Sequence, residues 1–146
     1  MRIYLIALII LLSLGLFTTQ TVVASESIVV IVNKDNQQPL AQQDIKNIYI
    51  DVVYQWKSGN RITVYNLPVD SDTREVFSQK LFGESAQRMA AEESNRKITN
   101  TIKNPSKTKR ARLVAKLVAK NPDAIGYIPA SMLDQTSNVR VILQID

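Results

Sequence analysis

The sequence predicts an α/β domain in which a mixed sheet is flanked by helices. Residues 28–32 form an unbroken run of β-branched apolar side chains, which is typical of a strand buried on both faces. A helical pattern over 40–49 and a second apolar run over 61–65 follow, so the chain opens in the order strand, helix, strand. A length of 146 residues, 45% of them hydrophobic, suits one such domain.

The first helix and the strand after it are identified by their spacing. Ile45, Ile48 and Tyr49 lie three and four positions apart, so they share one face of an amphipathic helix that starts just after a turn-rich stretch. A polar turn over 57–60 then leads into the second predicted strand, which is also buried.

The next helix follows a polar loop and carries its own start and stop signals. Val76, Phe77 and Leu81 form its buried stripe, and Gly83 ends it. Asp72 is the predicted N-cap, and the Glu three positions later completes a capping pair.

Two further helices and two strands complete the predicted domain. A short helix begins near Ser85 and turns Met89 and Ala90 inward, and an Asn-, Lys- and Thr-rich connection runs from 94 to 105. The third helix starts with Ser106 as its cap and stops at Asn121; its apolar face consists of Leu113, Val114, Leu117 and Val118. The last two predicted strands are 124–128 and 139–145.

The first 24 residues predict a secretory signal peptide. Arg2 supplies a positive start, residues 3–17 are almost entirely apolar, and small residues precede a cut after Ala24. A membrane anchor is the alternative, but about 20 apolar residues are needed to span a bilayer and polar residues from Thr18 onward leave this run short. Because small extracellular domains of eukaryotes usually carry disulfides, a Cys-free exported chain fits a bacterial periplasm better.

The composition excludes several kinds of chemistry. The chain has no Cys and no His, so it offers no imidazole base, no thiolate nucleophile and no zinc site with nitrogen and sulfur ligands. Its acidic residues show no spaced calcium-binding loop either. We therefore expect a protein that is not an enzyme and that uses neither a metal nor a cofactor.

The formal net charge of +5 arises from one segment. Residues 94–121 hold nine basic and no acidic residues. Four of these cations lie along one predicted helix face: Lys109, Arg112, Lys116 and Lys120. Such a stripe is either a solvated helix face or a surface for an acidic partner or an anionic membrane. Nucleic acid is not expected, because export separates the protein from it and no aromatic residues interleave the basic ones.

The loop and helix after the second strand have the features of an oxyanion site. A helix N-terminus offers free backbone N–H groups and the positive end of the helix dipole. Ser71 and Thr73 add hydroxyl donors on either side of Asp72, and Arg74 adds a forked cation. The alternative is that Asp70, Ser71 and Asp72 only cap the helix. The two carboxylates also oppose an anion, by roughly 1–4 kcal/mol for a like-charge pair at about 4 Å.

Several stretches together resemble one lobe of the phosphate-binding proteins of ABC transporters. The resemblance covers nearly all of residues 28–145, and its most specific parts are IKNIY…W.SG and NPDAIGYIP. The stretches that carry it are 40–49, 56–59, 62–64, 70–74 and 121–128. It implies that residues 25–146, after the signal peptide expected at 1–24, form a single periplasmic-binding-protein-like lobe of the type 2 class.

The resemblance also implies phosphate as the ligand, held at the loop after the ITV strand. In the family this loop reads approximately Arg-x-x-Gly-Ser-Gly-Thr, and Ser71 and Thr73 match its Ser and Thr. Leu67 stands at the position of the Arg, and Asp70 and Asp72 stand at the positions of the two glycines. These departures remove a bidentate donor and add charge where the backbone should approach the ligand closely.

Two functions are expected. The first is an exported, non-catalytic solute-binding module for phosphate or a similar oxyanion in ABC-type uptake or sensing, with an ABC permease or a membrane sensor as its partner. Receptors of this family close two lobes on their ligand, whereas this chain supplies one. The second is therefore an interaction protein or sensor adaptor that kept the lobe, lost the ligand and binds a partner protein or a second copy of itself.

Overall fold

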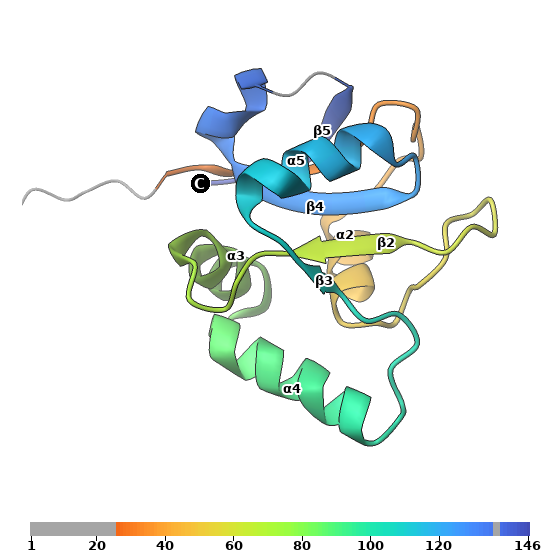
Figure 1. Ribbon diagram of the computed structural model, residues 1–146, viewed down its shortest axis with the longest axis vertical. Helices are drawn as coiled ribbons and strands as arrows, with labels where there is room; N and C mark the ends of the chain where they lie inside the picture. Colours follow the sequence, from red (N-terminus) through yellow and green to blue (C-terminus); the bar gives the residue numbers. More distant parts are fainter. Residues whose placement is uncertain (1–25, 136–137) are drawn as a thin grey trace, which may run out of the picture.

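The computed structural model describes residues 26–135 and 138–146 (Figure 1). The signal peptide expected at 1–24 lies outside these residues. Within the described ranges, no helix combines the length and the apolar character that crossing a bilayer would require.

Five strands form one mixed sheet in the order β3-β2-β4-β1-β5. The central strand β4 (Ala124–Pro129) runs antiparallel to β1 (Ile28–Asn33), which is also antiparallel to β5 (Val139–Ile145). On the other side, β2 (Thr63–Asn66) runs parallel to β4 and to the two-residue edge strand β3 (Lys107–Thr108). The predicted mixed sheet is confirmed, and β3 is the strand that the sequence did not predict.

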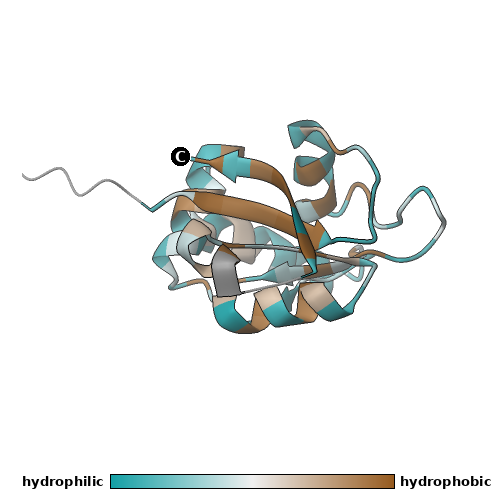
Figure 2. Cartoon of the chain, turned by 90° about the horizontal axis from the view of Figure 1, so that it is seen from above, coloured by the Kyte–Doolittle hydropathy of each residue, from teal (hydrophilic) through white to brown (hydrophobic). Residues whose placement is uncertain are grey.

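The centre of the sheet is buried on both sides, which explains why its strands show no hydrophobic alternation. All residues of β1 and of β4 are buried. In Figure 1, α5 (Ala111–Lys120) lies in front of β4 and α2 (Gln42–Tyr49) lies behind the sheet. Figure 2 shows the apolar strands running through the interior, with hydrophilic residues on the outer surfaces of the helices.

The helices α3 (Asp72–Phe82) and α4 (Ala86–Ile98) pack against each other beside the edge of the sheet. A carboxylate joins them, because Glu75 accepts hydrogen bonds from the backbone N–H of Ala86 at 2.8 Å and from the side-chain amide of Gln79 at 3.0 Å. These two hydrogen bonds hold the pKa of Glu75 below its usual value.

Helix α4 begins as predicted but ends later than predicted. Ser85 is its N-cap, and the Oγ of Ser85 accepts the backbone N–H of Arg88 at 3.1 Å. The helix continues through Ile98, so the prediction of an irregular connection from residue 94 is wrong. Only Ala86 is fully buried in this helix, and its last turns are polar and exposed, so hydrophobic periodicity could not mark its end.

Helix α5 packs on the sheet through most of its predicted face: Val114 and Val118 are buried and Leu117 packs against the core, but Leu113 does not. Its buried residues are Val114, Ala115 and Val118, whereas Leu113 is 43% exposed. The contact is closest at Gly126 of β4, where an added Cβ would lie 2.4 Å from Cγ1 of Val114. Since successive residues are about 100° apart around a helix, turning Val114 onto Gly126 turns Leu113 away from the sheet. The prediction of Leu113 as a core residue is therefore wrong.

Candidate functional site

Two helices begin at the same edge of the sheet. β2 and β3 are parallel neighbours, so their carboxyl ends lie together; the segment after β2 leads into α3 and the segment after β3 leads into α5 (Figure 1). In open α/β sheets, ligands bind outside the carboxyl ends of the strands. The two helix N-termini at this edge therefore form the candidate site.

The start of α3 is capped by its own chain. Ser71 is the N-cap, so the predicted cap at Asp72 is wrong by one residue. The Oγ of Ser71 accepts the backbone N–H of Arg74 at 3.4 Å, and its carbonyl accepts that of Glu75 at 3.0 Å. Because Glu75 is bound to α4, it does not complete the predicted capping pair. The backbone N–H groups of Asp72 and Thr73 have no hydrogen-bond partner among the described residues, so they remain available to an oxyanion.

The surface around this helix start is acidic. Asp70 and Asp72 are both exposed, and neither forms an ion pair with another residue in the described ranges. Ser71 lies between Asp70 and Asp72 in the sequence, and Thr73 follows Asp72. Both of these residues, which match the family's loop, are half-buried. An anion approaching the open amides would therefore meet two negative charges as well as the positive end of the helix dipole.

Arg74 points away from this surface. The residue is only 5% exposed, and its Nη1 donates to the carbonyl of Leu67 at 2.8 Å. Since Leu67 lies in the loop before the helix, the guanidinium ties that loop to the first turn of α3. The structure thus brings Ser71, Asp72 and Thr73 together but does not present the guanidinium of Arg74 beside them.

The buried Tyr127 and the half-buried Tyr49 lie near Arg74. The hydroxyl of Tyr127 donates to Oδ1 of Asn66 and accepts the backbone N–H of Leu67 at 3.4 Å. Burial raises the pKa of Tyr127, and burial followed by the neighbouring Tyr127 raises the pKa of Tyr49. Both hydroxyls therefore stay neutral, and the hydrogen bonds of Tyr127 hold the end of β2 and the loop that follows it.

The start of α5 differs from the prediction and from the start of α3. The helix begins at Ala111 with Arg110 as its N-cap, not near Ser106, because β3 intervenes. Ser106 is held instead by Glu93 of α4, whose carboxylate accepts its hydroxyl at 2.8 Å and its backbone N–H at 2.9 Å. Arg110 offers no side-chain acceptor, so the N–H groups of Ala111 and Arg112 are without a partner among the described residues.

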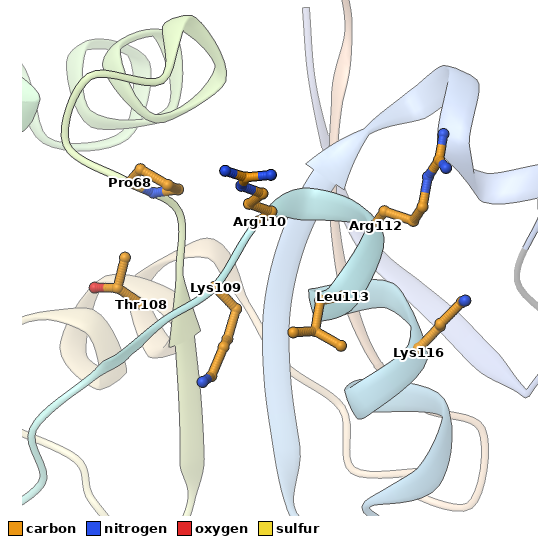
Figure 3. Close-up of a pocket in the computed structure, with 7 residues that line it drawn as sticks. All are labelled: Pro68, Thr108, Lys109, Arg110, Arg112, Leu113 and Lys116. Atoms are coloured by element: carbon orange, nitrogen blue, oxygen red, sulfur yellow. The ribbon is translucent and has the colours of Figure 1, made fainter.

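A pocket of about 540 Å³ lies at the start of α5 (Figure 3). Four of its lining residues are cations and none is acidic, and these cations form no ion pair within the described part of the chain. We call this group of residues the basic pocket: Pro68, Thr108, Lys109, Arg110, Arg112, Leu113 and Lys116. Figure 3 shows Leu113 between Lys109 and Lys116, with Arg110 extending toward Pro68.

The structure brings together three of the four cations predicted as a partner surface. Lys109, Arg112 and Lys116 line the basic pocket, although Lys109 precedes α5 rather than lying on it. Lys120 ends the helix and does not line the pocket. Sequence reasoning missed Arg110, whose signal was the lack of a capping residue directly before the periodic part of α5. It also missed Pro68, which reaches α5 only because β2 pairs with β3.

The chemistry of this edge is that of holding an anion. The two helix starts offer unpaired backbone N–H groups, the hydroxyls of Ser71 and Thr73, and the four cations of the basic pocket. No group of three or more side chains suited to a metal ion occurs in residues 26–135 and 138–146. Hydrogen-bond donation and positive charge are therefore what the site can supply to a ligand.

Comparison with known proteins finds a likeness of fold. No family model and no curated protein sequence matches the chain. A solved structure described as a phosphate ABC transporter substrate-binding protein with bound phosphate, from Clostridium perfringens, matches 80% of this chain and 44% of its own, with a TM-score of 0.61 and 24% identity. An ABC-type phosphate transport receptor from Vibrio cholerae matches 80% and 45%, with a TM-score of 0.61 and 20% identity.

The chain therefore has the α/β fold of one lobe of these proteins, as the sequence predicted. It spans less than half the length of either of them. At identities below a quarter, the likeness establishes the fold, and the function has to be argued from the site.

Proposed function

We propose that the protein is an exported, non-catalytic binding module of the solute-binding type, with phosphate or a similar oxyanion as its candidate ligand. The observation that supports this most is the start of α3, where the unpaired N–H groups of Asp72 and Thr73 lie beside the hydroxyls of Ser71 and Thr73. A solved structure with the same fold contains phosphate. A role in ABC-type uptake or sensing, beside a permease or a membrane sensor, is proposed on the same likeness.

Binding at this site would use backbone donors and the helix dipole. The amides of Asp72 and Thr73 donate to two oxygens of the anion, and the hydroxyls of Ser71 and Thr73 can donate further hydrogen bonds. Ser71 can do so while its Oγ accepts the N–H of Arg74, because a hydroxyl both donates and accepts. The loop is held in place because the carbonyl of Pro68 accepts the N–H of Ser71 at 3.0 Å.

Two opposing electrostatic effects set the affinity. The exposed carboxylates of Asp70 and Asp72 repel an anion by roughly 1–4 kcal/mol at about 4 Å, which is enough to lower affinity tenfold or more. The basic pocket adjoins the loop at Pro68, and its four cations raise the local concentration of anions. We expect weak binding of phosphate, with a Kd of about 1 mM.

Titration calorimetry with phosphate and sulfate tests this proposal. Replacing both carboxylates, Asp70→Gly with Asp72→Gly, should strengthen phosphate binding at least about tenfold. The change removes the repulsion and lets the phosphate approach the backbone closely. Asp35→Asn, which neutralises an exposed carboxylate at the opposite edge of the sheet, is the control and should change nothing. No heat and no thermal shift at millimolar phosphate, in the wild type and in the double-Gly variant, would exclude phosphate as the ligand.

A second candidate function is an interaction protein or adaptor that kept the lobe and lost the small ligand. It is favoured by the inward orientation of Arg74 together with the exposed Leu113 in the basic pocket. Reversing the charges of Lys109, Arg112 and Lys116 should abolish partner binding or self-association. If the same variant also loses phosphate binding, the basic pocket serves the small ligand instead.

A further inference from the structure

An acidic loop and the basic pocket lie side by side on one edge of the molecule. We define the acidic loop as residues 69–72, in which Asp70 and Asp72 are exposed and Val69 is 42% exposed. Pro68 lines the basic pocket, and Asp70 follows it by two residues, so their Cα atoms lie within about 8 Å of each other. One face of the protein therefore carries neighbouring patches of opposite charge.

Among the residues that the structure describes, these opposite charges do not pair with each other. Asp70 and Asp72 form no ion pair with a residue in the described ranges, and neither do the four cations of the basic pocket. Exposed charges do pair elsewhere on the surface, where Arg88 lies 3.1 Å from Glu92 and Lys97 lies 3.1 Å from Glu93. Both patches are therefore open to a charged group from outside the chain.

Each patch also carries an exposed apolar side chain, which a partner covering the patch would bury. Leu113 is 43% exposed among the cations, and Val69 is 42% exposed beside the carboxylates. The stems of the Lys and Arg side chains extend the apolar lining of the basic pocket. An apolar residue flanked by carboxylates, as in the acidic loop, is complementary to this lining in both charge and polarity.

We propose that the basic pocket binds the acidic loop of a second copy of this chain, in a dimer with two-fold symmetry. A two-fold interface uses the same surface of both copies. The acidic loop of each copy therefore contacts the basic pocket of the other. Adjacent patches of opposite charge meet this requirement when the axis passes close to Pro68. This dimer specifies the partner of the interaction protein proposed as the second candidate function, and the proposal rests on that function.

In this dimer each copy completes the helix start that the other leaves open. The carboxylates of Asp70 and Asp72 would face the N-terminus of α5 in the partner copy, where the N–H groups of Ala111 and Arg112 are unpaired. Negative charge at a helix N-terminus is favourable because of the helix dipole. A protein that stays monomeric and binds anionic lipid vesicles through this pocket would assign the pocket to a membrane surface instead.

Sedimentation equilibrium of the purified protein at low ionic strength gives the first test. The wild type should form dimers. The dissociation constant of the dimer should rise at least about tenfold in 0.5 M salt, because salt screens contacts between exposed charges. Lys34→Glu with Lys57→Glu reverses two exposed lysines at the opposite edge of the sheet and should dimerise like the wild type.

A charge exchange between two variants gives the decisive test. Lys109→Glu, Arg112→Glu and Lys116→Glu leave Arg110 as the one cation lining the basic pocket and make the pocket acidic, and Asp70→Lys with Asp72→Lys makes the loop basic. Each variant alone should be monomeric, because like charges then face each other in both contacts. An equimolar mixture should form heterodimers, because both loop-to-pocket contacts are again attractive.

Several results would overturn the proposal: a wild type that remains monomeric at low salt, a dimer that tolerates both reversals, or a mixture that stays monomeric. A monomer whose basic pocket binds a Glu-rich peptide would assign the pocket to a different acidic partner. Thermal unfolding of each variant establishes that its fold is intact. Phosphate titration of the Lys109→Glu, Arg112→Glu, Lys116→Glu variant is read separately, so phosphate binding can stand where dimerisation fails.

Discussion

The helices α3 and α5 begin at the same edge of the sheet but satisfy their N-termini in opposite ways. Both starts expose backbone N–H groups and the positive end of a helix dipole. In α3, Ser71 caps the helix and Asp72 and Glu75 supply negative charge in the first turn. In α5, the cap position is Arg110, the first turn has no acidic residue, and cations surround it. The chain thus supplies the α3 start with a side-chain cap and negative charge of its own, although the N–H groups of Asp72 and Thr73 stay unpaired among the described residues, and it supplies the α5 start with neither.

The largest effect on stability is expected from Arg74, which ties the preceding loop to the capped start of α3. Arg74→Leu removes the donor to the buried carbonyl of Leu67, and a buried acceptor without a partner costs about 1–3 kcal/mol. Urea unfolding measures this loss. Lys80→Leu, at an exposed cation of the same helix, is the control and should stay within about 0.5 kcal/mol of the wild type. Unchanged stability of Arg74→Leu combined with weaker phosphate binding would instead assign Arg74 to the ligand.

A smaller loss is expected at the cap itself. Ser71→Ala removes the acceptor for the N–H of Arg74 and should lower the free energy of unfolding by about 1 kcal/mol. Ser85→Ala at the start of α4 is a matched variant, since Ser85 accepts the N–H of Arg88 in the same way, and it should lose a similar amount. A loss at Ser85 with none at Ser71 would contradict the role of Ser71 as the cap of α3.

At the open start the expected change has the opposite sign. Arg110→Ser supplies the missing cap to α5 and should raise the free energy of unfolding by about 0.5–1 kcal/mol. The same variant removes a cation from the basic pocket, so it should weaken dimerisation. A gain in stability with weaker association is the signature of a helix start kept open for binding. Loss of stability, or stronger association, would argue against it.

The smallest effect is a pH dependence at Glu75. Hydrogen bonds from Ala86 and then Gln79 lower the pKa of this carboxyl in the folded protein, so its contribution to stability is present above the unfolded pKa and is lost as pH falls through the folded value. Glu75→Gln should therefore cost stability at pH 7 and less at pH 3. Glu84→Gln, an exposed neighbour, is the control. Equal losses for Glu75→Gln at both pH values would show that these hydrogen bonds do not favour the charged form.

Much of the fold was predictable because burial on both faces leaves a clear pattern in the sequence. The runs of β1 and β4 are apolar throughout, and the starts of α2 and α4 follow recognisable signals. The end of α4 was not predictable, because its last turns face solvent. The exposure of Leu113 depends on the close approach of Val114 to Gly126, a contact that periodicity alone does not reveal.

The candidate site was predictable only in part. Ser71, Asp72 and Thr73 were found because a helix start after a strand has a local signature. The inward orientation of Arg74 goes with its hydrogen bond to the carbonyl of Leu67 and with its burial, which no local pattern reveals. The basic pocket depends on the pairing of β2 with β3, which are separated by about forty residues in the sequence, so no local pattern places Pro68 beside α5.

The most direct test of the account is a paramagnetic NMR experiment on the contact between two copies. The chain has no Cys, so Lys80→Cys, at an exposed position of α3 outside the acidic loop, allows one spin label to be attached without entering the proposed contact. The spin-labelled copy, which carries no ¹⁵N, is mixed with ¹⁵N-labelled wild type. Broadening of the ¹⁵N-labelled amide signals then arises only from contacts between two copies. The account predicts broadening of the amides of residues 108–116, at the start of α5, and none around Lys34 and Lys57. Broadening elsewhere, or none at concentrations where the protein is dimeric, would contradict it.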